Sequence, residues 1–259
     1  MSELQTPSWT VEFQRYLHVV FTFFSPPEKE HQLILLPMIC SVCIAIFCST
    51  LLFNGIVCDS LTEICPETFV IIPWGGYIVG TRSAARFITY AFHHLNFLHI
   101  STNLIVLFPT LYFLEKKYGF WRMLLDSVVS AIGGAIFAWF WMKPGDIVVG
   151  VSAVAYGYIF LYYADLIVNW YSCSMPKIEL ILSSTGLFSL IMEGIFNRIG
   201  YSNVATAAHL GGGLASLFFG LLVLPHFISQ KWETWLPIIG LILMSLEFGL
   251  LPGLLSIYK

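Results

Sequence analysis

One segment of the chain reads VATAAHLGGGLASLFFGLLVLP over residues 204–225. It carries no charged residue apart from one histidine, and it is long enough to cross a bilayer, which takes about 20 mostly apolar residues. Small residues recur at every fourth position, at Ala208, Gly212, Ser216 and Gly220. Such a face lets two membrane helices approach closely, so the segment predicts a transmembrane helix in the tightly packed part of a bundle.

The composition extends this prediction to the whole chain. Of its 259 residues, 58% are hydrophobic and 10% are charged, whereas a soluble domain carries about 25% charged residues. Seven segments are predicted to span the membrane: roughly 33–53, 98–114, 120–142, 147–168, 178–198, 204–225 and 235–256. These runs are continuous, while the strands of a transmembrane barrel alternate over short segments. The predicted fold class is therefore an all-α polytopic membrane protein, with a six-helix core plus one C-terminal transmembrane helix.

The predicted organisation has three parts: an N-terminal segment 1–32 in the cytosol, the core 33–225, and a linker with the seventh helix over 226–259. The distribution of Lys and Arg between the loops agrees with a cytosolic N-terminus. The long connection from Asn54 to Leu95 is expected to lie at the membrane interface. Within it, Cys58 and Cys65 either pair in an oxidising compartment or stay free.

Charge and cysteine spacing exclude several classes of function. The net charge is −3 and no basic run is present, so no nucleic-acid partner is expected. None of the six cysteines forms a CxxC pair with further partners at zinc spacing, so the sequence predicts neither a metal site nor a cofactor. The one partner that the composition itself requires is the lipid bilayer.

Four polar residues in the predicted helices are candidates for a functional site, because polar groups in lipid are costly. His99, Asn103, Ser152 and His209 all lie near the start of helices that cross the membrane in the same direction, with Ser152 expected about one turn into its helix. They therefore share one depth beneath one face of the membrane. A lone serine in a helix usually bonds a carbonyl one turn back, and a lone histidine is often an interfacial anchor. The shared depth of the four residues favours a functional site over these separate structural roles.

The chemistry of this set is that of nucleophilic catalysis. Close packing of segments 147–168 and 204–225 would bring Ser152 to His209, and a neutral histidine can activate a serine hydroxyl. His99 and Asn103 lie on one helical face and can donate to an oxyanion, with the backbone N–H of Ser152 as a third donor. Gly150 leaves room for a substrate backbone.

Three ordered motifs carry a resemblance to a known family. Residues 85–119, ARFITYAFHHLNFLHISTNLIVLFPTLYFLEKKYG, contain an arginine followed by HxxxxHxxxN and ExxxG. Residues 150–157, GVSAVAYG, are similar to a GxSGxxYG motif, and residues 208–212, AHLGG, to an AHxxG motif. Together they resemble the rhomboid family of intramembrane serine proteases over roughly residues 69–225.

The resemblance implies Ser152 as nucleophile, His209 as base, and His99 with Asn103 as oxyanion donors. It implies supporting or structural roles for Gly150, Tyr156, His94, Arg86, Glu115 and Gly212, with Tyr156 packed against His209. Substrates would be single-span transmembrane proteins. A seventh helix at the C-terminal end resembles members of the secretory pathway, so that pathway or the plasma membrane is favoured over the mitochondrion. Ala153 departs from the pattern, because the family has glycine there.

The residues also support predictions about mechanism and alternatives. No Asp or Glu of the helices predicted between residues 98 and 225 is expected at the depth of His209, so the sequence predicts a Ser–His dyad whose imidazole is oriented by packing. Gly186 and Gly194 make segment 178–198 the expected loose wall, so substrate entry is expected beside this segment or beside segment 98–114. The alternative is an inactive rhomboid-like protein that binds membrane clients: Ala153 favours it, and the retained Ser152 and His209 oppose it. A transporter would show an inverted repeat, and none is apparent.

Overall fold

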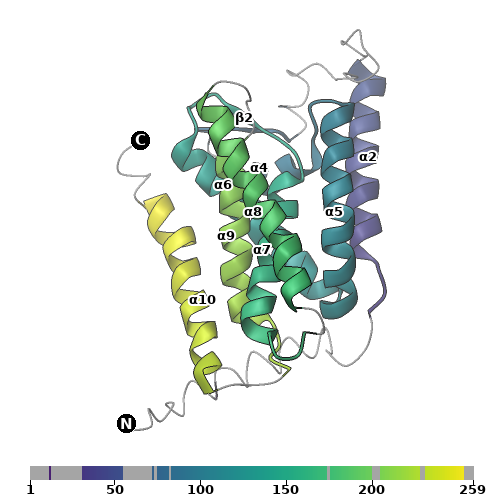
Figure 1. Ribbon diagram of the computed structural model, residues 1–259. Coiled ribbons are helices and arrows are strands. Elements are labelled where there is room, and N and C mark those ends of the chain that lie inside the picture. The colour runs from purple at the N-terminus through teal and green to yellow at the C-terminus, as the bar shows by residue number, and fades with distance from the viewer. Residues whose placement is uncertain are drawn as a thin grey trace.

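The computed structural model describes residues 31–54, 75–81, 83–173, 176–199, 205–227 and 231–253, together with Glu12 and Ile72. These residues form a bundle of helices (Figure 1). The long helices are α2 (Leu35–Asn54), α5 (Phe97–Tyr118), α6 (Phe120–Trp141), α7 (Ser152–Asn169), α8 (Pro176–Arg198), α9 (Thr206–Val223) and α10 (Leu236–Ser245). The short elements are α4 (Arg86–Thr89), the 3-10 turns Tyr90–Phe92 and Lys231–Trp235, the π-helical turn Leu246–Leu250, and strands β1 (Tyr77–Ile78) and β2 (Ile147–Val148). The predicted cytosolic segment 1–32 lies almost entirely outside the described residues, as do Cys58 and Cys65.

Six of the described helices are long and apolar enough to cross a membrane: α2, α5, α6, α8, α9 and the helix formed by residues 232–253. The exception among the predicted spans is α7. Most of its residues are buried, from Ala153 to Asn169, so its side chains face protein rather than lipid and need not be as apolar. With α7 included, the all-α polytopic membrane fold and its C-terminal extra helix are as predicted.

The start of α7 differs from the prediction. Ile147 and Val148 are extended and pair antiparallel with Ile78 and Tyr77. Gly150 then takes a φ of +118°, a conformation that favours glycine, and the helix begins at Ser152. Ser152 is therefore the first residue of the helix and does not lie one turn into it, so its backbone N–H is one of the groups that a helix leaves unpaired at its N-terminus.

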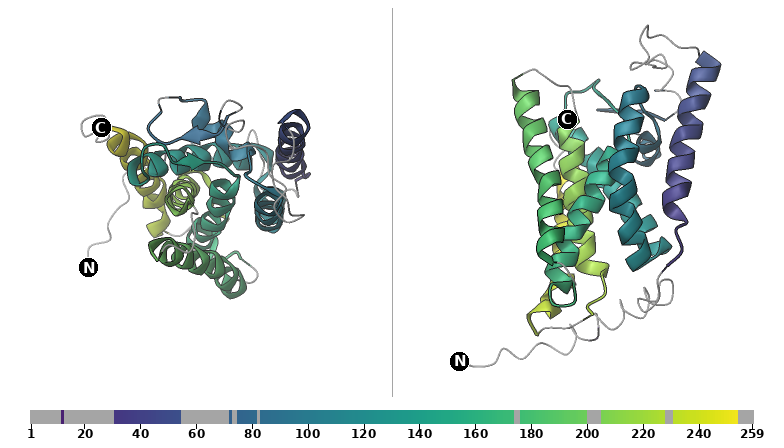
Figure 2. Two further views of the ribbon diagram at one scale, coloured as in Figure 1. Left: turned by 90° about the horizontal axis from the view of Figure 1, so that it is seen from above. Right: turned by 45° about the vertical axis from the view of Figure 1, so that its right-hand side comes forward.

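The centre of the bundle is α9, with α6 and α7 packed closely against it. A Cβ on Gly212 would collide with the carbonyl oxygen of Ala153, and one on Gly220 would lie 2.5 Å from the Cβ of Ala164. The predicted close pairing of the two helices is thereby confirmed. Seen from above, α9 is enclosed, whereas α8 lies along one outer side of the bundle (Figure 2).

Helices α2 and α5 lie side by side at the opposite side of the bundle (Figure 1). Glu115, near the end of α5, accepts hydrogen bonds from the backbone N–H groups of Ile34, Leu35 and Leu36 at 2.8, 2.5 and 2.9 Å. A carboxylate is well suited to the unpaired N–H groups at the start of a helix. Glu115 thus ties the N-terminus of α2 to α5.

Candidate active site

Ser152 and His209 meet where α7 and α9 begin. Ser152 opens α7, and His209 is in the first turn of α9. The Oγ atom of Ser152 lies 2.8 Å from Nε2 of His209, which agrees with the predicted proximity of the two side chains. The distance depends on the small residues between the helices, because Gly212, three residues after His209, rests directly on the backbone of Ala153.

A third polar residue completes the contacts of His209. Oε2 of Glu193 lies 2.6 Å from Nδ1 of His209. The side chain of His209 is 7% exposed and that of Glu193 is 20% exposed. The expectation that no acidic residue reaches the depth of His209 was therefore wrong. Glu193 belongs to α8, the segment predicted to be the loose wall.

The direction of the helices explains why Glu193 reaches the site. Because consecutive helices alternate in direction, α8 arrives at the level where α7 and α9 begin. Glu193 lies five residues before the end of α8, and His209 three residues after the start of α9. The signal was available in the sequence, since Glu193 is an acidic residue in the otherwise uncharged run 180–197.

Tyr156 contacts both His209 and Glu193. Its ring stacks on the imidazole with centroids 4.6 Å apart and planes at 20°, as the resemblance implied. Its hydroxyl donates to Oε1 of Glu193 at 2.6 Å and lies 3.0 Å from Oγ of Ser189. Each oxygen of the Glu193 carboxylate therefore has its own partner, one of them on α9 and the other on α7.

Two nitrogens converge on the backbone just before Ser152. A Cβ on Gly150 would lie 2.9 Å from Nε2 of His99 and 3.0 Å from Nδ2 of Asn103, so only glycine fits there. Nδ1 of His99 accepts from the backbone N–H of Leu95 at 3.4 Å. In a neutral imidazole the proton is then on Nε2, which faces Gly150.

The Asn103 amide is also free to donate. Among the described residues, its buried Nδ2 has no hydrogen-bond partner, although buried polar groups are normally paired. The start of α5 is fixed by Asn96, whose side chain accepts from the backbone N–H of His99 at 2.7 Å. His99 and Asn103, one turn apart, thus present two donors to the space beside Gly150 and Ser152.

His94 lies behind His99. Its ring is edge-on to that of His99 with centroids 5.2 Å apart, and its Nε2 is 3.5 Å from the backbone N–H of Val151. Burial, with smaller effects from His99 and His93, lowers the pKa of His94 to about 3. His94 is therefore neutral at physiological pH and supports the segment that leads to Ser152.

The side chain of Ala153 points away from this group. Its Cβ lies 2.9 Å from the position that a Cβ on Gly134 of α6 would occupy. The extra methyl group, relative to the glycine of the rhomboid motif, is thus accommodated opposite Gly134. The sequence provided no means of pairing these two positions.

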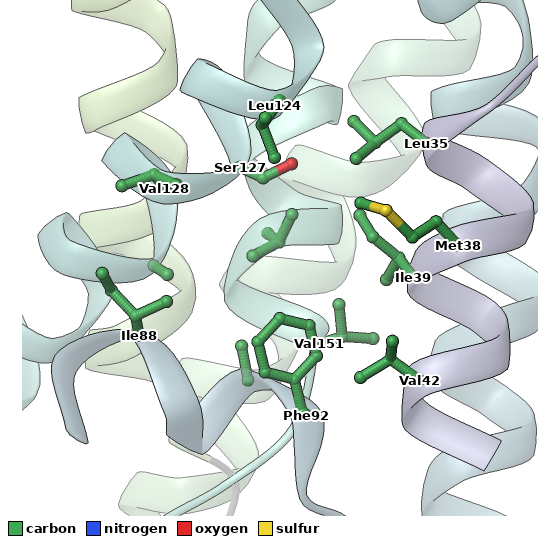
Figure 3. A pocket seen from close by; sticks show the side chains of 13 residues that line it. Leu35, Met38, Ile39, Val42, Ile88, Phe92, Leu124, Ser127, Val128 and Val151 are labelled. Atoms are coloured by element: carbon green, nitrogen blue, oxygen red, sulfur yellow. The ribbon is translucent and has the colours of Figure 1, made fainter. Parts of the chain in front are cut away.

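The remaining motif residues lie away from the serine. Arg86 donates to the carbonyl of Gly76 at 3.3 Å, and Glu115 is at the other end of α5 from His99. An apolar cavity of about 140 Å³ lies between α2, α4, α6 and α7 (Figure 3). Its described lining includes Met38, Phe92 and Val154 and none of the predicted site residues.

Comparisons with known proteins identify the family of the chain. The rhomboid domain model matches residues 81–226, more than half of the chain. The chain is 28% identical over 170 residues to Rhomboid-related protein 1 of Caenorhabditis elegans, covering 64% of this chain and 47% of that protein. It is 30% identical over 178 residues to Rhomboid-type serine protease 2 of Emericella nidulans, and the match covers 66% of this chain and 34% of that protein. It is 31% identical over 142 residues to RHOMBOID-like protein 5 of Arabidopsis thaliana, and the match covers 54% of this chain and 44% of that protein. In each case the match spans less than half of the relative. The chain belongs to the rhomboid family.

Proposed function

We propose that the chain is an intramembrane serine endopeptidase that cleaves transmembrane segments of other membrane proteins. The observation that carries the proposal is the 2.8 Å contact between Oγ of Ser152 and Nε2 of His209. A hydroxyl so close to an imidazole can pass its proton to the ring as it attacks a carbonyl carbon. The name of the Emericella nidulans relative, a serine protease, supports the same reaction.

The proposed reaction has two halves. Oγ of Ser152 bonds to the peptide carbon while Nε2 of His209 takes the hydroxyl proton, and the carbonyl oxygen becomes an oxyanion. His99, Asn103 and the backbone N–H of Ser152 stabilise that oxygen, as donors aimed at developing charge do. The C–N bond then breaks and the amine leaves with the proton from His209. Water, losing a proton to His209, cleaves the acyl-serine ester and restores the hydroxyl.

The site requires a substrate segment whose peptide bonds are accessible. A helix hides its peptide bonds from a nucleophile, so a substrate segment must unwind near the level of Ser152. Residues such as Gly or Pro promote unwinding, because they are poor helix formers. We therefore propose single-span proteins with such residues near the non-cytosolic end as substrates, entering beside α8. A run of leucines through that region is expected to suppress cleavage.

The proposed cell compartment is the secretory pathway or the plasma membrane, with the N-terminus in the cytosol. Water must then reach Ser152 from the non-cytosolic side. Ser152→Cys in a cysteine-free background is expected to react with a membrane-impermeant thiol reagent from that side. Labelling from the cytosolic side alone would overturn the proposed topology.

The function is tested by cleavage of a model single-span substrate by the purified protein. Ser152→Ala and His209→Ala are each expected to abolish cleavage. Ser245→Ala is the matched control, because in the described part of the chain Ser245 bonds only to the carbonyl of Leu241 one turn back, at 2.8 Å. Binding of the substrate without cleavage by the unaltered protein would contradict the protease proposal and support the alternative, an inactive client-binding protein.

A further inference from the structure

We propose that Glu193 is a positioning residue for His209, so that the site works as a Ser152–His209–Glu193 triad. The inference rests on the proposed protease function and goes beyond a Ser–His dyad. Its basis is the contact between Oε2 of Glu193 and Nδ1 of His209 at 2.6 Å. That contact lies on the side of the ring opposite to the one that faces Ser152.

The contact determines which nitrogen of His209 carries a proton. An ionised carboxylate only accepts hydrogen bonds, so Nδ1 must be the donor and Nε2 is left with its lone pair. That lone pair is what the hydroxyl of Ser152 requires in a base. The carboxylate also stabilises the imidazolium that forms during attack, as the aspartate does in the serine-protease triad.

Glu193 is itself held in place. The Tyr156 hydroxyl donates to Oε1 at 2.6 Å, which leaves Oε2 directed at His209. The same tyrosine stacks on the imidazole. Orientation of His209 therefore combines the packing expected from the sequence with a carboxylate that restricts rotation of the ring and sets its tautomer.

A purely structural role is the competing explanation, in which Glu193 only fastens α8 to the bundle. The chain offers a control for it. Nδ2 of Asn197, one turn after Glu193 on α8, lies 2.6 Å from Oγ1 of Thr206 on α9. This bond also fastens α8 to α9, but it does not involve His209.

The experiment compares Glu193→Gln with Asn197→Ala in the purified full-length chain, using a model single-span substrate. Glutamine keeps the size of the side chain and can still accept from Tyr156, but it no longer enforces the tautomer. We expect Glu193→Gln to lower kcat by about 100-fold or more and to change KM by less than about twofold. Replacing the triad aspartate of a serine protease by asparagine lowers kcat by about 10⁴-fold. Asn197→Ala is expected to stay within about twofold of the unaltered protein in both constants.

Two further measurements separate positioning from fastening. Proton NMR of the unaltered protein should show a far-downfield signal from the Nδ1 proton of His209, and Glu193→Gln should lose it. Tyr156→Phe should lower kcat about fivefold alone and have little further effect in the Glu193→Gln background, because residues in one network are not additive.

The outcomes are distinct. A kcat for Glu193→Gln equal to that of the unaltered protein would overturn the triad and leave the protease function standing. Equal losses in Glu193→Gln and Asn197→Ala would mean that fastening of α8 is what matters, which also overturns it. If the unaltered protein does not cleave at all, the proposed function falls, and the catalytic role of Glu193 falls with it.

Discussion

Helices α9 and α8 each bring one residue to the site, but the bundle holds them differently. α9 supplies His209 from the interior, where 61% of its membrane-spanning stretch is buried. α8 supplies Glu193 from the outside, with 12% of its stretch buried. α9 is enclosed by neighbouring helices, whereas α8 faces the surroundings along most of its length (Figure 2).

The contacts of the two helices differ in kind. Gly212 of α9 rests on a backbone carbonyl of α7, whereas Gly186 of α8 rests on the side chain of Ile159. Backbone atoms in a packed interface cannot give way, but a side chain can change rotamer. The Ser152–His209 distance should therefore be nearly invariant, while the His209–Glu193 distance should respond to small shifts of α8.

The largest effect is expected from Gly212→Val at the α7–α9 interface. A Cβ there would collide with the carbonyl of Ala153 and lie 2.9 Å from Oγ of Ser130. Separation of the helices should abolish cleavage and lower the free energy of unfolding by about 2–3 kcal/mol, as overpacking does. Thermal unfolding in detergent measures this. Leu210→Val is the control, because Leu210 is on the exposed side of α9 at 37% exposure.

Asn103→Ala tests the interior part of the site without disturbing the helices. Loss of one oxyanion donor typically costs about 100-fold in kcat, and the buried amide of Asn103 gives up no other hydrogen bond in the described structure. Kinetics and unfolding should be measured together. Thr102→Ala is the neighbouring control, because among the described residues the Thr102 hydroxyl bonds only to backbone carbonyls of α5. An unchanged rate in Asn103→Ala and in the double mutant with His99→Ala would remove both residues from the mechanism.

Gly186→Ala tests the exposed helix. Its Cβ would lie 2.6 Å from Cγ2 of Ile159, and an outward shift of α8 that relieves this contact would carry Glu193 away from His209. We expect kcat to fall about tenfold with a small change in stability, since α8 buries little surface. Gly194→Ala is the matched control on the same helix, because its nearest neighbour, Cγ2 of Thr206, is 3.9 Å away. Equal rates for the two variants would show that the position of α8 does not govern the site.

The smallest effect is expected from Ala153→Gly, which restores the glycine of the rhomboid motif. Because the Ala153 methyl group faces Gly134 and not His99 or Asn103, kcat should stay within about twofold. Stability should fall by up to about 1 kcal/mol, the cost of glycine in a helix relative to alanine. A large gain in kcat would mean that the methyl group does restrict the oxyanion site.

Much of the site was predictable from the sequence, because its residues are polar in segments that are otherwise apolar. This is why the sequence singles out Ser152, His209, His99 and Asn103. Glu193 is also a polar residue in an apolar segment, and because its helix runs in the opposite direction it reaches the same level near the end of the helix. The predicted start of α7 is several residues too early, because the apolar Ile147 and Val148 suit a strand as well as a helix. Their pairing with Tyr77 and Ile78 is a long-range contact that local periodicity does not contain.

The sequence by itself determined which described segments form membrane helices, to within several residues at their ends, and the closeness of α7 and α9. Hydrophobic length and a stripe of small residues are local properties, and the bilayer acts on them directly. Only the tertiary structure decided that Glu193 faces His209 and that Ala153 faces Gly134. A membrane helix that is apolar on all sides carries no periodic signal for its rotation, so the facing residues are set by packing against its neighbours.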